Sequence, residues 1–130
     1  MLTLLSAGIS FGQNLKKHRW NQRVLIVTAK NISLLKEQMD SLTKDIQGLQ
    51  ERKLAIYQVT PNGYAKGTRM TNWTKTKDFY QKITKRKKNF EVILIGLDGG
   101  VKLRQTELLT LEKLFTFIDG MPMRRAEIKN

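Results

Sequence analysis

The sequence predicts a single α/β domain in which a central mixed sheet is flanked by helices. Two observations carry this prediction. The first is a set of short β-branched apolar runs, and the second is that longer segments with apolar residues at helical spacing lie between them. A third is size, because 130 residues with 40% hydrophobic and 27% charged side chains are typical of one folded domain with its own core.

The first half of the chain predicts a strand, a helix and a second strand. Residues 23–29 (RVLIVTA) are β-branched and apolar, as expected for a strand that is buried on both faces. Asn31 or Ser33 offers an N-cap for the amphipathic helix that follows, with apolar residues at three- and four-residue spacing. Residues 53–60 (KLAIYQVT) read as the second strand, and Pro-Asn-Gly at 61–63 is a turn signal.

The second half predicts a loop at 64–72, a helix over about 74–88, and then two strands and a last helix. The strands are 90–96 (FEVILIG) and 101–105 (VKLRQ). The last helix covers about 109–119, and Gly120 followed by Pro122 is the usual arrangement for ending one.

The predicted order is therefore β-α-β-α-β-β-α. Right-handed crossover connections would make the first three strands parallel, and a tight hairpin would make the fourth antiparallel. This arrangement predicts a thioredoxin-like fold.

The turn of that hairpin is formed by Asp98, Gly99 and Gly100. Asp-Gly between two apolar runs is a strong hairpin signal, because glycine adopts positive φ without strain. The alternative is that Asp98 is a metal ligand or an acid–base group, although no histidine or second carboxylate lies near it in the sequence. The spacing of a phosphate-binding loop is absent.

Charge is the most unusual feature of the composition. There are 24 Lys and Arg against 11 Asp and Glu, a net charge of +13, which favours an anionic partner. The densest basic region is 66–88, with Tyr64 and Trp73 close by as candidate stacking residues. The candidate anion-binding residues are Lys75, Lys82, Lys85, Arg86, Lys102, Arg104, Arg124 and Arg125.

Two other interpretations of these residues stay open. The basic region is equally consistent with an ordinary solvated surface. Arg124 and Arg125 are a possible clamp for a carboxylate or phosphate, but they are also placed to reach back to carboxylates of the chain itself.

The N-terminus predicts export. Residues 1–12 combine an apolar stretch, too short to span a bilayer, with a small-x-small cleavage pattern at Ser10-Phe11-Gly12, although no basic residue precedes it. Residues 13–130 would then form the mature domain, in the periplasm or outside the cell. The alternative is a cytoplasmic nucleic-acid-binding protein, in which the apolar stretch is part of the fold. In the exported case we expect an anionic glycan, lipopolysaccharide or an acidic protein as partner, rather than nucleic acid.

Catalysis has little support in the sequence. The chain has no cysteine, which excludes thiol–disulfide exchange, thiol peroxidase activity and cysteine-type zinc sites. His18, the one histidine, is expected on the surface, and Trp20 is expected to anchor the core. No cofactor or metal is predicted. The alternative is an enzyme of unknown type with its site at 98–104 and 121–125.

Two stretches carry a resemblance to a known family. HRWNQRVLIVTA, and FEVILIGLDGGVKLRQTE with the helix and MPMRR that follow it, are similar to the peroxiredoxin-like domain of unknown function called P-DUDES. This family is found in small exported bacterial proteins, in equarin and in sushi-repeat-containing proteins. The resemblance implies a thioredoxin-like fold and no established activity. The loop at the start of the first helix, TAKNISLL, lacks the paired cysteines of a thioredoxin, and no proline precedes the third strand.

Overall fold

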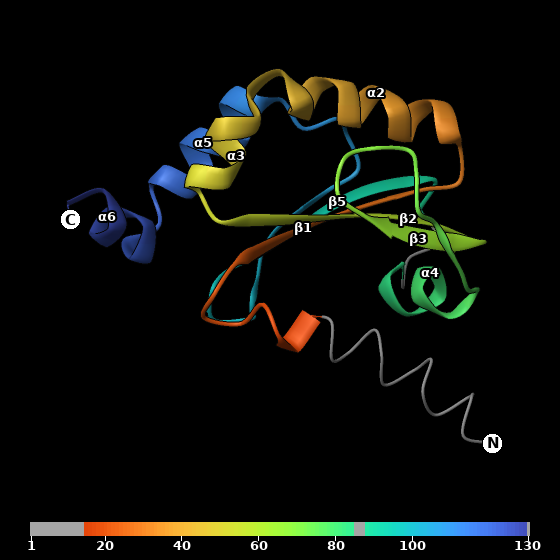
Figure 1. Cartoon of the computed structure of the whole chain (residues 1–130), viewed down its shortest axis with the longest axis horizontal. Helices are drawn as coiled ribbons and strands as arrows, with labels where there is room; N and C mark the ends of the chain where they lie inside the picture. The colour runs from red at the N-terminus through yellow and green to blue at the C-terminus, as the bar shows by residue number, and fades with distance from the viewer. Residues whose placement is uncertain (1–14, 85–87, 130) are drawn as a thin grey trace.

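The computed structural model describes residues 15–84 and 88–129, which form a helix–sheet–helix sandwich (Figure 1). The sheet has the strand order β4-β3-β2-β1-β5-β6. Its strands are β1 (Arg23–Ala29), β2 (Leu54–Thr60), β3 (Gly63–Lys66), β4 (Thr74–Lys75), β5 (Phe90–Ile95) and β6 (Val101–Gln105). The helices are α2 (Ile32–Leu42), the short 3₁₀ turn η1 (Thr43–Asp45), α3 (Ile46–Glu51), α4 (Asp78–Ile83), α5 (Leu111–Asp119) and α6 (Pro122–Lys129). A mixed sheet flanked by helices is therefore confirmed.

Each face of the sheet packs against its own set of helices. On one face Leu25 and Val27 of β1 pack with α2, α3 and α5, whereas on the other Val24 and Ile26 pack with α4 (Figure 1). All seven residues of β1 are buried because it lies inside the sheet with both faces covered. Asn31 caps α2 by accepting from the Ser33 N–H at 2.7 Å, as predicted.

The predicted parallel arrangement of the first three strands is wrong for the third. β1 and β2 are parallel, but β5 lies beside β1 in the antiparallel direction. The reason is the length of α4, which has six residues where the sequence predicted a helix over about 74–88. Six residues rise about 9 Å, less than half the length of β5. The chain therefore enters β5 at the end of the sheet where β1 stops, and Lys30 N–H donates to the Asn89 carbonyl there.

The predicted loop at 64–72 is partly a strand. After the turn at residues 61–62, β3 pairs with β2, and β4 pairs with β3 at the edge of the sheet. Gly63 makes this edge possible, since a Cβ at this position would lie 2.4 Å from the Thr74 carbonyl oxygen.

The prediction of one last helix is also incomplete, because the chain ends in two helices. α5 is capped by Thr110, whose hydroxyl accepts from the Lys113 N–H, and it ends at Gly120. Gly120 is the C-cap with a φ of −82°, so it ends the helix without the left-handed conformation that glycine often adopts there. Pro122 does not end the helical part of the chain. It begins α6, where its fixed φ and missing N–H suit the first helical turn.

Candidate functional site

The turn between β5 and β6 is held by its own polar groups. The Gly99 N–H donates to the Gly96 carbonyl at 3.0 Å, and Gly99 has a φ of +86°. The Asp98 carboxylate accepts from the Gly100 N–H at 2.9 Å and from Lys102 Nζ at 2.9 Å. These two bonds, the Gly100 bond foremost, lower the pKa of Asp98. Asp98 is thus ionised at neutral pH and engaged in the turn.

A cluster of ion pairs joins α3, α5, α6 and the start of β1. Arg124, which is 4% exposed, donates to Glu51 at 2.8 Å, to Asp119 at 3.0 Å and to Glu127 at 3.4 Å. We call this the C-terminal ion cluster, and its members are Arg23, Arg52, Arg124, Glu51, Asp119 and Glu127. The exposed Lys53 lies at its margin, 3.8 Å from Glu127. Arg124 thus reaches back to carboxylates of the chain, which is one of the two roles that the sequence left open.

Asp119 shows how strongly this cluster favours ionised carboxylates. It accepts from Arg52 at 2.8 and 3.0 Å and from Arg124 at 3.0 Å. The Arg52 bonds, followed by the bond from Arg124, lower the pKa of Asp119 against the opposing effect of burial. The guanidinium of Arg52 also lies 3.8 Å from the centroid of the Phe115 ring.

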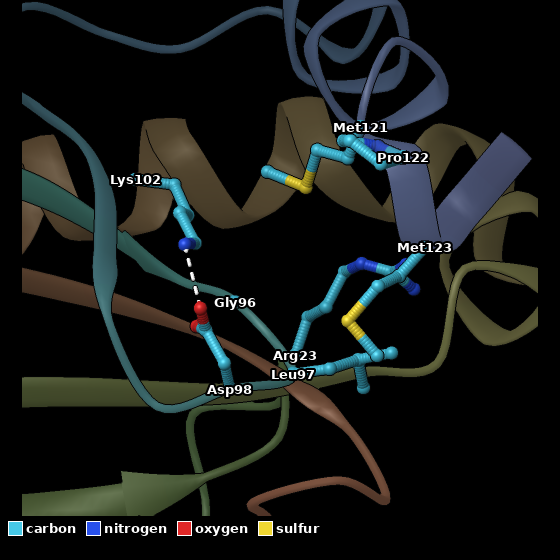
Figure 2. A pocket seen from close by; sticks show the side chains of 8 residues that line it. All are labelled: Arg23, Gly96, Leu97, Asp98, Lys102, Met121, Pro122 and Met123. Atoms are coloured by element: carbon cyan, nitrogen blue, oxygen red, sulfur yellow. Dashed lines mark hydrogen bonds and ion pairs between the residues drawn. The ribbon is translucent and has the colours of Figure 1, made fainter.

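A pocket lies where the β5–β6 turn meets the first turn of α6 (Figure 2). Its volume is about 240 Å³. We call it the hairpin pocket, and its lining residues are Arg23, Gly96, Leu97, Asp98, Lys102, Met121, Pro122 and Met123. The structure thus brings together the LDGG and MPM motifs, which lie more than twenty residues apart in the sequence.

Exposed lysines gather at the other edge of the sheet. Between Arg52 and Phe90 the chain has a single carboxylate, Asp78. We call the exposed lysines on β3, on β4 and around α4 the basic edge: Lys66, Lys75, Lys77, Lys82 and Lys88. They are connected in space, because α4 packs on β2 and β3 and the Tyr80 hydroxyl donates to the Lys88 carbonyl.

The predicted anion-binding residues do not lie in one patch. Lys75 and Lys82 belong to the basic edge, whereas Lys102 and Arg104 lie on β6, at the opposite edge of the sheet. Five strand spacings separate β4 from β6, a distance of about 24 Å. Lys85 and Arg86 lie outside the described residues.

The remaining candidates differ in how far their charges are already paired. Arg104 donates to Glu91 at 2.9 Å, and Lys102 pairs with Asp98. Arg125 is exposed on α6, next to the buried Arg124.

Two predictions about the N-terminal part of the domain are wrong. His18 is buried, with Nδ1 bonded to Gln22 Oε1 at 2.6 Å and Nε2 bonded to the Tyr57 hydroxyl at 2.8 Å. Burial lowers the pKa of His18, and burial raises the pKa of Tyr57 to about 12. Trp20 is 59% exposed, with the Arg19 guanidinium 5.3 Å from its ring centroid.

Sequence reasoning missed Arg23 as a site residue. It opens a strand of otherwise apolar and small residues and is 1% exposed, so the only signal was a charged residue at the first position of a buried strand. Over residues 15–84 and 88–129, no group of three or more histidine, aspartate or glutamate side chains is arranged to hold a metal ion. No helix within the same ranges is long and apolar enough to cross a membrane.

Comparisons with known proteins identify the family but not an activity. No curated protein and no solved structure matches the chain. Residues 14–127 match the family described as "Domain of unknown function (DUF4174)". This match covers most of the chain, so the protein belongs to the DUF4174 family.

Proposed function

We propose that this domain is a non-catalytic binding module whose basic edge binds an anionic glycan. The observation that carries the proposal is the separation of charge within the molecule. The carboxylates of the C-terminal ion cluster pair with arginines, whereas five exposed lysines of the basic edge share a segment with one carboxylate, Asp78. An uncompensated group of cations creates a local positive potential that attracts polyanions.

A glycan suits the basic edge better than a nucleic acid does. Sequence-independent binding of single-stranded nucleic acid depends on aromatic side chains that stack on bases. Tyr64 and Trp73, the candidate stacking residues, pack against the core clusters on the two faces of the sheet. Phe79 and Tyr80 of α4 are buried. Lysine ammonium groups act as mobile point charges, which match the separated sulfate or phosphate groups of a glycan chain.

The proposal includes two wider expectations. Export follows from the interpretation of residues 1–12 as a signal peptide, which lies outside the described residues, and it would place the domain in the periplasm or outside the cell. A thioredoxin-like fold is supported by the four neighbouring strands β2-β1-β5-β6, with a helical connection between β1 and β2 and a hairpin between β5 and β6. The proposed relation to the peroxiredoxin-like P-DUDES domains rests on the sequence resemblance alone.

The test is a salt titration of heparin binding with two triple variants of equal net charge. Lys75→Gln/Lys77→Gln/Lys82→Gln neutralises the basic edge. The control, Lys44→Gln/Lys113→Gln/Lys129→Gln, neutralises three exposed lysines on other elements. Each lost ionic contact reduces the slope of log K against log salt by a little under one. We expect the slope of the first variant to be smaller in magnitude by up to about 2.7, and the control to behave as the unmodified protein.

Equal losses in the two variants would overturn the proposal, because binding would then depend on net charge alone. Lipopolysaccharide, polyglutamate and single-stranded DNA are titrated in parallel. Tighter binding of polyglutamate or DNA than of heparin at about 150 mM salt would assign the basic edge to an acidic protein or a nucleic acid instead.

A further inference from the structure

The hairpin pocket contains a buried arginine whose hydrogen bonds are incomplete. Arg23 Nη1 donates to the Arg52 carbonyl at 3.0 Å, and the two terminal nitrogens make long contacts of 3.4 Å with Glu127. The Nε–H of Arg23 has no hydrogen-bond partner among the described residues. A buried donor without a partner is costly, so this nitrogen favours a ligand atom that accepts a hydrogen bond.

A pair of oppositely charged side chains, Asp98 and Lys102, lies across the pocket from Arg23. Figure 2 shows the Arg23 side chain on one side and the linked side chains of Asp98 and Lys102 on the other. Lys102 lies over Gly96, where a Cβ would approach its Cε to 2.6 Å, so the glycine leaves room for this side chain. The pocket therefore holds two cations and one exposed carboxylate, in addition to the Glu127 contacts behind Arg23.

Between these charged sides the walls are apolar. Leu97, Met121 and Met123 line the pocket, and Figure 2 shows the two methionine side chains on either side of Arg23. Thioether side chains adapt to ligand shape and make favourable contacts with aromatic rings. A volume of about 240 Å³ equals that of about eight water molecules, which suits a small acid and excludes a nucleotide or an oligosaccharide.

We infer that the hairpin pocket binds a small monocarboxylate with a compact apolar body. The carboxylate lies between the Lys102 ammonium and the Arg23 guanidinium. Because Arg23 Nε is itself buried, one carboxylate oxygen accepts from it only after the exposed Met123 side chain shifts, and the body packs between Met121 and Met123 over Leu97. A dianion fits less well, because Asp98 faces the pocket as an ionised carboxylate. This site is separate from the basic edge and its ligand is not a polymer, so it does not depend on the proposed glycan binding.

The test uses benzoate as the probe and the methionine methyl groups as reporters. In the ¹³C-methyl-methionine protein, Met121 and Met123 line the pocket, while Met39 is buried in the core beneath α2 and serves as the internal reference. We expect benzoate to shift the Met121 and Met123 signals with a dissociation constant of about 1 mM or tighter. Acetate, which lacks the apolar body, and benzyl alcohol, which lacks the carboxylate, should each bind at least tenfold more weakly.

Variants at exposed positions test the assignment without altering the buried Arg23. Met123→Asp places a negative charge at the pocket and should weaken benzoate binding at least tenfold, read from the Met121 signal. Ile128→Asp makes the same change at an exposed position of α6 away from the pocket and should leave binding unchanged.

Asp98→Asn keeps the acceptor for the Gly100 N–H but removes the opposing charge. It should tighten benzoate binding about threefold, while Lys102→Gln should weaken it. The inference is overturned if benzoate shifts neither methionine signal at 10 mM, if benzyl alcohol binds as well as benzoate, or if Ile128→Asp weakens binding as much as Met123→Asp.

Discussion

The C-terminal ion cluster and the basic edge are both rich in cations, but they differ in what surrounds the charge. In the cluster, Arg23 and Arg124 are almost fully buried and lie 2.8 to 3.4 Å from carboxylate oxygens. On the basic edge the lysines are exposed, with Asp78 as the one carboxylate in the segment. A buried charge requires a partner, whereas an exposed lysine is already solvated by water.

The choice of residue follows the same division. The cluster uses arginine, whose planar guanidinium donates to two or three acceptors at once, as Arg52 does to both oxygens of Asp119. The basic edge uses lysine, a flexible point charge. Net charge alone therefore says little about function, because part of the basic excess of this protein stabilises the fold and another part faces solvent.

The sharpest test of this comparison is a pair of neighbouring arginines in α6. Arg124→Ala removes the buried partner of Glu51, Asp119 and Glu127, and we expect a loss of about 3 kcal/mol in the free energy of unfolding. Arg125→Ala removes an exposed side chain of the same type from the same helix. It should change the free energy of unfolding by less than about 0.5 kcal/mol. Urea unfolding of both variants measures the difference.

Similar stability of the two variants would show that the cluster contributes nothing beyond ordinary surface charge. A loss of heparin affinity in Arg125→Ala, with stability unchanged, would extend anion binding to α6 and weaken the division between the two regions.

The second prediction concerns pH. In the folded state the pKa of His18 lies below its usual 6.5, mainly through burial and in part through Lys66 and Lys17, so the unfolded chain binds more protons as the pH falls through this window. The free energy of unfolding should therefore decrease from about pH 7 downward, by at most about 1.4 kcal/mol per pH unit. His18→Gln retains an acceptor for the Tyr57 hydroxyl and does not titrate, so its stability should be nearly constant between pH 7.5 and 5.

The ion cluster responds in a different pH range. The pKa of Asp119 is lowered from its usual 3.8, so its contribution is complete above that value and is lost only as the pH falls through the lower folded-state pKa. Chemical unfolding at a series of pH values separates the two ranges. If His18→Gln kept the slope of the unmodified protein above pH 5, the assignment to His18 would be wrong.

The sequence predicted the parts of the fold that depend on local patterns. β1 and β5 are apolar runs, Asn31 is a typical N-cap, and Asp98-Gly99 is a typical hairpin turn, so each is encoded by residues close together in the chain. The direction of β5 was not predictable in this way, since it depends on where α4 ends. Neither glycine nor proline follows Ile83 before β5 in the sequence, so no local signal marked the end of that helix.

The candidate site shows the same limit. Arg124 and Arg125 are equivalent in sequence, and only the packing of α6 against α3 and α5 makes the first buried and leaves the second exposed. Likewise, Arg23 became a candidate only when the fold placed it beside Met121 and Met123, about one hundred residues further along the chain. Long-range contacts of this kind have no periodicity that a single sequence reveals.

The smallest expected effect concerns the cost of leaving cations unpaired at the basic edge. Lys75→Gln/Lys77→Gln/Lys82→Gln should raise the free energy of unfolding by about 0.5 kcal/mol or less at 20 mM salt, because it relieves repulsion among exposed charges. Lys77 precedes α4 and Lys82 lies in its last turn, so their interactions with the helix dipole oppose each other. At 0.5 M salt the gain should vanish, since screening then acts over only a few ångströms. A destabilisation of more than about 1 kcal/mol at either salt concentration would mean that these lysines stabilise the fold. The basic edge would then be structural, as the C-terminal ion cluster is, and the distinction between the two regions would be wrong.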